Sequence, residues 1–460
     1  MSSRKTLAGM LAAGTLSVLN FGTALAAVSA EEAAQLDGPV LTWIGSERAG
    51  NKEGTIPEFA GKGVKPPPSW DPKNPGQRPD PYGDKPLFTI TAQNVAQYAD
   101  KLDGMVEVFK RYPDYRMDIY PSHRDYKVPQ YVKDNTRKNA TACTAENDEL
   151  TLKGCYGGTP FPIPKNGKQA MWNHLVSYNT FNLVGTAESY LIPTSGAPVL
   201  MARGTYYLNY PIFDPDHKGP VPPNIVYFQT LAHEEAPARI AGQQSLVIDP
   251  VDQLKLGRRA YVYVTGRRWV KLAADLSYDT PNPYCGGSAT MDDTRVFYGA
   301  LDRWNFELVG KKEKFIQYNN FAATDMKACP TGKIESTKGF PHPDCVRWEL
   351  HRVWVVKATL KPGYHHTYAK RMMYWDEDGF IAGNGENYNS AGKLIRVANI
   401  MYYPMYDDDG AWGGTNNYMN LESGAWANAG GTNCEGCGYD APKGRFPADL
   451  FNPNSMGGIR

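Results

Sequence analysis

The cysteines are the residues with the clearest chemical options in this chain. Seven are present, and six of them form three pairs that are close in sequence. The pairs are Cys143 with Cys155, Cys329 with Cys345, and Cys434 with Cys437. Close pairs in a secreted chain favour disulfides, which would leave Cys285 without a partner.

The last of these pairs has a second chemical interpretation. Cys434-Glu435-Gly436-Cys437 has the spacing of a redox motif or of half a zinc site. No helical pattern follows the pair, and no other pair has zinc-ligand spacing. We therefore predict a disulfide and no metal, with metal binding and redox chemistry as the alternatives.

Two histidine motifs offer further candidates. His233-Glu234-Glu235 begins like a metalloprotease motif, but Pro237 stands where that motif requires its second histidine. His365 and His366 adjoin a predicted turn. They could bind a metal or titrate near neutral pH, although a solvated strand end is the commoner interpretation.

Acidic and glycine-rich motifs do not indicate an active site either. The acidic runs at 376–379 and 407–410 lack the ligand spacing of a calcium loop, which favours turns. No Gly-x-Ser-x-Gly motif is present, and Gly383-Asn384-Gly385 lacks the third glycine of a dinucleotide loop. We therefore predict no catalytic residue, no cofactor and no enzymatic activity. A hydrolase with two carboxylates stays open, because sequence does not reveal which acids converge in space.

Charge and composition exclude other classes of function. The 460 residues carry 49 Lys and Arg against 48 Asp and Glu. This balance argues against a nucleic-acid partner, because phosphate binding requires a basic surface. Aromatic residues make up 12% of the chain, and 29 residues are tyrosine. Such a composition predicts a folded protein with much amphipathic ring surface.

The N-terminus has the pattern of a secretory signal peptide. Arg4 and Lys5 precede an apolar stretch, and Ala24-Leu25-Ala26 supplies a small-x-small cleavage site. Residues 1–26 are therefore predicted to be removed, which leaves a periplasmic protein that is soluble after cleavage. No later apolar run is long enough to span a membrane.

The elements that must position any site begin with helices. A short helix is expected within 27–36, and the Pro- and Gly-rich sequence over much of 27–90 predicts an extended strap. A helical pattern begins at Thr91 and ends at Tyr112-Pro113. Two further helices are predicted at 127–138 and 167–178.

Strands are predicted from about residue 180 onward. Six segments rich in β-branched and aromatic residues are separated by Gly and Pro turns. They are 181–192, 198–210, 224–234, 243–249, 259–264 and 267–272. Residues 346–404 then contain four strands joined by turns so short that the strands must be antiparallel neighbours. The Gly-, Asn- and Trp-rich sequence over 405–460 predicts a loop-rich tail.

These elements predict an α+β fold with one domain over 91–404. A large antiparallel sheet has to curl or split, and the early helices would cover one of its faces. Rings on the concave face of a curled sheet would line a site for a hydrophobic ligand. The residues predicted to line this site are Tyr261, Tyr263, Trp348, Leu350, Trp354, Val356, Met372 and Tyr374.

The second strand block also resembles a known family. The runs 352–363 and 368–378, followed by Tyr388, Gly392-Lys393-Leu394 and Arg396, are similar to the strand pattern of outer-membrane lipoprotein-sorting proteins, the periplasmic carrier LolA and its relatives. More closely, residues 31–404 resemble a LolA-like family of secreted proteobacterial proteins of about this length. The segments that carry this likeness are 50–57, 160–166, 172–174 and 304–313.

The resemblance implies an unclosed antiparallel β-barrel with helices over its mouth, holding an acyl chain or another lipid. It implies a carrier or chaperone between the inner and outer membranes. The implied partners are an exporter of the resistance-nodulation-division type and an outer-membrane protein. The paired cysteines and the tail depart from the family pattern, and no catalytic residue carries over. An envelope hydrolase on lipid or polysaccharide, and a carbohydrate-binding protein with exposed rings, stay as alternatives.

Overall fold

One large sheet dominates the computed structural model, which describes residues 28–74 and 76–458. The predicted signal peptide lies outside the described residues. The sixteen strands of the sheet are β1 (Phe88–Ile90), β2 (Met117–Tyr120), β5 (Asn182–Ile192), β6 (Val199–Asn209), β7 (Val226–Ala236), β8 (Gln244–Pro250), β9 (Arg259–Val264), β10 (Trp269–Leu272), β11 (Trp304–Gln317), β12 (Trp348–Leu360), β13 (Lys370–Asp376), β14 (Gly383–Tyr388), β15 (Leu394–Ile400), β18 (Asn416–Asn420), β19 (Trp426–Gly431) and β20 (Gly438–Asp440).

The strands follow one path across the sheet. Their order is β1-β2-β12-β13-β14-β15-β18-β19-β5-β6-β7-β8-β9-β10, with β11 paired to β12 and β20 paired to β5. Neighbours are antiparallel except β2 and β12, which are parallel. Because β1 and β10 end the path without pairing to each other, the sheet is not closed. The α+β fold with a large unclosed antiparallel sheet is confirmed.

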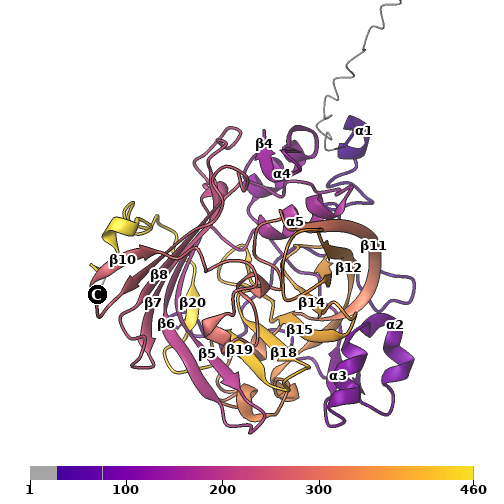
Figure 1. The fold of residues 1–460 in the computed structure, drawn as a ribbon. Coiled ribbons are helices and arrows are strands. Elements are labelled where there is room, and N and C mark those ends of the chain that lie inside the picture. The colour runs from indigo at the N-terminus through magenta and orange to yellow at the C-terminus, as the bar shows by residue number, and fades with distance from the viewer. Residues whose placement is uncertain (1–27, 75, 459–460) are drawn as a thin grey trace, which may run out of the picture.

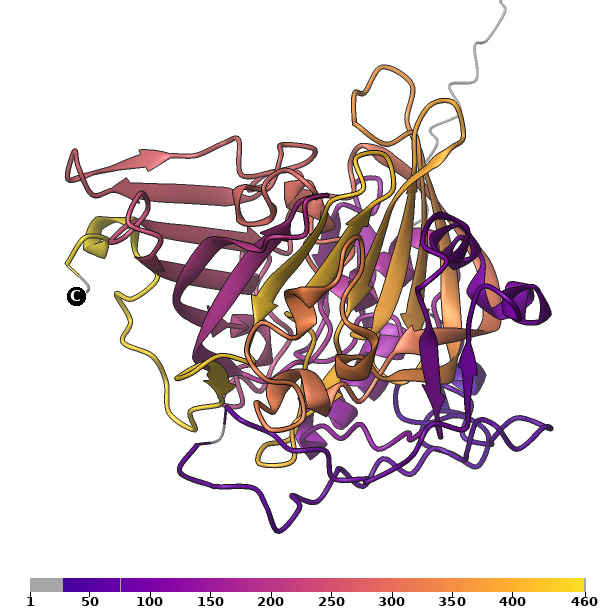
Figure 2. The same cartoon turned by 90° about the horizontal axis from the view of Figure 1, so that it is seen from below.

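The sheet curls strongly at one end and spreads at the other. Strands β11 to β15 wrap around tightly, whereas β5 to β10 form a broad open wing (Figure 1; Figure 2 gives the view from below). Short strand pairs lie outside this sheet: β3 (Thr144–Glu146) with β4 (Thr151–Lys153), and β16 (Tyr403–Pro404) with β17 (Ala411–Trp412). The curvature creates a concave interior between the wing and the curled end.

Helices lie at two places around the sheet (Figure 1). α2 (Ala99–Leu102) and α3 (Met105–Arg111) lie beside the curled end, and α2 contacts β11. α4 (Gln130–Ala142) and α5 (Gly167–Leu175) lie together, where α5 contacts β11 and β12 and α4 contacts the short α1 (Ala30–Ala33). Among the described residues, no helix is both long and apolar enough to cross a bilayer.

The helix predicted from Thr91 to Tyr112 is interrupted, so that prediction was wrong in its continuity. A 3-10 turn (Val95–Tyr98) and α2 end at Asp103, whose φ of 50° turns the chain before α3. The Asp103 carboxylate accepts from Lys312 at 2.7 Å and from the buried Lys314 at 2.8 Å. The interruption of the helix therefore places the Asp103 carboxylate where it can accept from the Lys314 ammonium group, which is buried in the sheet.

The tail is also more regular than predicted. Residues 405–460 contribute β18, β19 and β20 to the large sheet, and β1 joins it from the strap, so the sheet extends past both limits of the predicted domain. Two asparagines of β18, Asn416 and Asn417, are buried. Asn417 is satisfied there, because it donates to Gln317 Oε1 at 2.9 Å and accepts from Asn399 at 3.1 Å. These segments of the tail form strands because they pair with strands that are distant in the chain, and the local sequence does not reveal such pairing.

The strap and the cysteines agree with the sequence patterns. The described residues between 50 and 86 form no helix or strand, and the buried Arg78 fixes this segment to the tail through two bonds to Asp407, at 3.0 and 2.8 Å. Disulfides join the three close cysteine pairs, and Cys285 is a buried free thiol.

Candidate functional site

A cavity lined mostly by apolar and aromatic side chains lies on the concave side of the wing. The volume of the cavity is about 220 Å³, whereas a single water molecule needs about 10–15 Å³ on the same measure. The cavity can therefore hold an organic molecule. The aromatic residues that line it are Tyr206, Tyr210, Phe228, Tyr284, Tyr298, Trp412, Tyr418 and Tyr439.

The floor of the cavity follows from strand alternation. Residues of one β-strand point alternately to opposite faces, and Phe228, Thr230 and Ala232 of β7 all point into the cavity. Ala232 lies opposite Tyr206 of β6 in the register. Val247 of β8, opposite Thr230, continues the floor. The small Ala232 and Thr230 leave space that the rings around them enclose.

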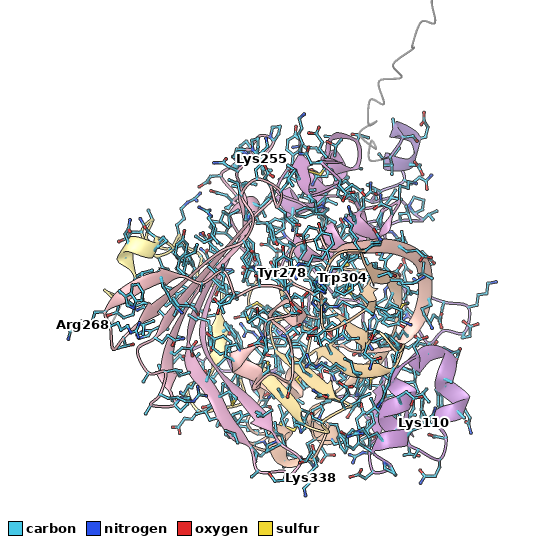
Figure 3. All side chains as sticks on the ribbon, in the orientation of Figure 1. Lys110, Lys255, Arg268, Tyr278, Trp304 and Lys338 are labelled. Carbon is cyan, nitrogen blue, oxygen red and sulfur yellow. A yellow bond between two sulfur atoms is a disulfide. The ribbon has the colours of Figure 1, made fainter. Side chains whose placement is uncertain are left out.

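The roof is the segment between β10 and β11, residues 273–303, which we call the inner segment. It contains two 3-10 turns, Pro283–Cys285 and Met291–Asp293, and the first of these contacts β5, β6 and β19. Figure 3 shows side chains filling the interior between the two ends of the sheet, with Tyr278 and Trp304 labelled there and Arg268 at the periphery. The inner segment therefore covers the cavity, while α2 and α5, which belong to the predicted helices, lie against β11 of the sheet.

A buried ionic cluster holds the inner segment against β13. The Arg371 guanidinium donates to Asp293 Oδ1 at 2.7 Å and to the Val296 carbonyl at 2.8 Å, and it lies 3.1 Å from Asp292 Oδ2. Burial alone would raise the pKa of Asp292, but the charge of Arg371 and a hydrogen bond from His366 lower it to about 2. Asp292 is thus an ionised partner of a buried cation, and Asp293 contacts the same guanidinium.

Arg295 of the inner segment brings a positive charge to the cavity wall. Its Nη2 donates to Ser177 Oγ at 2.9 Å, while Nε and Nη1 have no hydrogen-bond partner among the described residues. Arg295 and Val296 have φ angles of 50° and 67°, which side chains with a Cβ rarely adopt. The bond from Arg371 to the Val296 carbonyl helps to hold this conformation.

Glu234 lies just beyond the cavity floor, at the end of the β7 face that carries Ala232. It is fully buried opposite Gly204, and neither carboxylate oxygen has a hydrogen-bond partner at normal distance among the described residues. Burial raises the pKa of Glu234 to about 7, although the nearby hydroxyls of Tyr284 and Tyr206 act in the opposite direction. A carboxyl group that titrates near neutral pH therefore lies beside a hydrophobic cavity.

None of the eight residues predicted to line a ligand site lines this cavity. Trp348 and Leu350 belong to a separate core cluster that α2 and α3 help to form, and Tyr261 and Tyr263 pack near the C-terminus against Leu246 and Met456. The other four belong to the largest core cluster or pack against it: Trp354, Val356, Met372 and Tyr374. The structure therefore distributes the eight over three clusters.

The other sequence candidates have structural roles. The side chain of His366 is fully buried and its Nε2 lies 3.1 Å from Asp292, so the expected solvated strand end was wrong for this residue. Cys434, Cys437 and Glu188 come close enough to hold a metal ion. However, the sulfurs form a disulfide, and Glu188 bonds Arg203 at 2.7 Å.

Sequence reasoning missed Arg295 altogether. Its neighbours in space are Ser177, which follows α5, and Tyr298 of the inner segment, and no local motif marks it. Glu234 was considered only within the rejected histidine motif. Its charge on a strand face that otherwise carries the uncharged Phe228, Thr230 and Ala232 is the signal that could have found it.

Comparisons with known proteins give the family. Two solved structures are similar over part of the chain. They are a DUF1329 family protein from Desulfovibrio piger (TM-score 0.40, 12% identity, covering 62% of this chain and 95% of that chain) and the LolA superfamily protein NE2245 from Nitrosomonas europaea (TM-score 0.34, 11% identity, covering 63% and 98%).

The sequence matches are more extensive. A protein of Pseudomonas aeruginosa, described as "Uncharacterized protein PA3922", is 38% identical over 443 residues, which cover 95% of each chain. The family model described as "Protein of unknown function (DUF1329)" matches residues 89–457, which include the tail as well as the strand blocks. The family resemblance seen in the sequence is thus confirmed: the chain belongs to the DUF1329 family.

Proposed function

We propose that this protein is a carrier that binds a lipid or another hydrophobic molecule in the cavity of its curved sheet. The observation that supports this most strongly is the ring of buried and half-buried aromatic side chains around an open volume between the wing and the inner segment. Burying about ten methylene groups of an acyl chain there would contribute about 8 kcal/mol before the opposing terms.

The two alternatives predict different surfaces. A sugar-binding platform needs exposed rings side by side, but the most exposed rings, Phe88, Trp269 and Tyr364, belong to β1, β10 and the turn after β12. A hydrolase needs a pair of carboxylates or a nucleophile with a general base, and the described lining of this cavity has Ser and Thr hydroxyls but no His, Asp or Glu to activate them. Both observations favour binding of a hydrophobic molecule over these alternatives.

The cellular setting is a further part of this proposal. A protein with the N-terminal pattern of a signal peptide would act in the periplasm, where a hydrophobic cargo needs shielding from water between the two membranes. An exporter of the resistance-nodulation-division type and an outer-membrane protein would then deliver and receive the cargo.

We expect the purified protein to bind the neutral fluorescent probe N-phenyl-1-naphthylamine and to release bound lipid in native mass spectrometry. Val247→Trp should weaken probe binding by about tenfold or more, because the indole fills the cavity beside Thr230 and removes a hydrophobic contact area worth at least about 1.4 kcal/mol. Fluorescence titration measures the change.

Val199→Trp is the matched control, since Val199 is 46% exposed at the start of β6 and does not line the cavity. Its probe affinity should equal that of the wild type. The carrier proposal fails if the wild type neither binds the probe nor carries lipid, or if Val247→Trp binds as tightly as the wild type while keeping its thermal stability.

A further inference from the structure

Two arginines line the cavity, and they differ in their partners. Arg258 pairs with Asp249 through two hydrogen bonds, both of 2.8 Å, and donates to the Tyr298 carbonyl at 2.9 Å. Arg295 is only 5% exposed and makes one bond, to the neutral Ser177. No acidic group of the described residues forms an ion pair with it.

An unpaired arginine in this position is energetically unfavourable. The guanidinium keeps its charge at any physiological pH, so Arg295 does not escape the cost of burial by losing a proton. Leaving a buried ion without a counter-ion costs several kcal/mol. The Tyr298 ring, whose centroid lies 5.2 Å from the Arg295 Cζ, offsets part of this cost through a cation–π contact. Two nitrogen atoms with hydrogens to donate are still left over.

Resting on the proposed carrier function, we propose that the cargo is an amphiphile whose anionic headgroup, a carboxylate or a phosphate, binds Arg295. The aliphatic part of the cargo then lies along Phe228, Ala232 and Val247 on the cavity floor. The headgroup supplies the counter-ion that the protein itself does not provide. Arginine suits this role because its planar donors match carboxylate and phosphate oxygens.

The backbone around Arg295 is consistent with a binding role. Two consecutive residues with positive φ, one of them the β-branched Val296, store strain that surrounding contacts must hold in place. Those contacts come from two sides. Arg371 donates to the Val296 carbonyl, and Nε2 of His174 in α5 lies 3.0 Å from the Phe297 carbonyl oxygen. The backbone that carries Arg295 is thus held in place before any cargo arrives, and the bond to Ser177 orients the guanidinium at the cavity wall. This lowers the entropy cost of binding.

The test compares ligands that share one chain and differ in headgroup. Hexadecanoate, hexadecyl phosphate and hexadecanol are titrated against the full-length mature protein loaded with N-phenyl-1-naphthylamine. A charge-assisted contact predicts that at least one anion displaces the probe at about tenfold lower concentration than the alcohol. The two anions distinguish a carboxylate from a phosphate headgroup. In Arg295→Gln the advantage of the anion should disappear, while hexadecanol binds as before.

Two further variants separate charge from structure. Arg295→Lys keeps the positive charge and should keep most of the preference for the anion, and Ser177→Ala removes only the hydrogen bond at Nη2 and should leave the preference intact. If hexadecanol binds the wild type as tightly as both anions, or if Arg295→Gln keeps the preference, the headgroup inference is wrong and the carrier proposal stands. If the probe itself does not bind, the carrier proposal fails first.

Discussion

Replacing Arg371 by leucine is expected to lower the free energy of unfolding by about 3–5 kcal/mol, because it leaves buried carboxylates without their cation. Asp293 would lose a bond of 2.7 Å and Asp292 a partner at 3.1 Å, and both acids are fully buried. Two ion-pair partners would remain, His366 at 3.1 Å from Asp292 and Arg396 at 3.8 Å from Asp293, beside uncharged donors such as Tyr368. Denaturant unfolding followed by tryptophan fluorescence measures the loss.

The neighbouring Lys370→Leu is the matched control on the same strand. Lys370 is only half-buried and lies over the Tyr388 ring at 3.8 Å, so its removal should cost about 1 kcal/mol or less. Arg371→Lys keeps the charge but has fewer donors, and its stability should fall between the wild type and Arg371→Leu. Equal stability of Arg371→Leu and Lys370→Leu would contradict the view that this cluster holds the inner segment.

The same substitution should also affect ligand binding. Arg371 bonds the carbonyl of Val296, the residue next to Arg295, and through Asp292 and Asp293 it holds the turn that precedes them. The stability cluster and the cavity wall therefore belong to one segment of chain. If Arg371→Leu still folds, its preference for hexadecanoate over hexadecanol should be smaller than that of the wild type.

Much of the fold could be predicted because its signals are local. Alternation and short turns mark strands such as β12 and β13, and the N-cap Asn166 after a proline-rich run marks the start of α5. The segments β18 and β19 could not be predicted in this way, because their Asn-, Gly- and Ala-rich sequences become strands only between β15 and β5, which are distant in the chain. Asp103 breaks the early helix for a similar reason, since its partner Lys314 lies in β11.

The ligand site was harder to predict than the fold. A concave aromatic interior follows from a curled sheet rich in tyrosine, but which block of strands lines an open space depends on what fills the rest. At the curled end, Val356 and Tyr374 pack within the core, whereas the inner segment leaves space over β6, β7 and β8. Sequence gives no measure of that space, because it results from the path of residues 273–303 across the interior.

Glu234→Gln is expected to make the protein more stable at alkaline pH and to leave its stability unchanged at acidic pH. Burial raises the pKa of Glu234 from 4.5 to about 7, so the folded state holds a proton that the unfolded state releases. The contribution of Glu234 to the free energy of unfolding is therefore fully present below pH 4.5 and is lost as the pH rises through about 7. Above pH 7 the wild type should have lost about 3 kcal/mol of unfolding free energy that Glu234→Gln keeps.

The measurement is denaturant unfolding of both proteins at about pH 4 and about pH 8. Glutamine keeps the shape of the side chain and can exchange hydrogen bonds with the Tyr206 and Tyr284 hydroxyls, so no cavity is introduced. Glu235→Gln is the control: this neighbour is exposed and accepts from Thr205 at 2.9 Å. Its charge is the smallest cause of the raised pKa of Glu234, so its substitution should change the pH dependence far less than Glu234→Gln does. A Glu234→Gln variant whose stability tracks the wild type at both pH values would mean that the carboxylate is solvated or paired in the folded protein. In that case Glu234 would not gain its negative charge near pH 7, and it would not begin to repel an anionic cargo in the neighbouring cavity as the pH rises through that value.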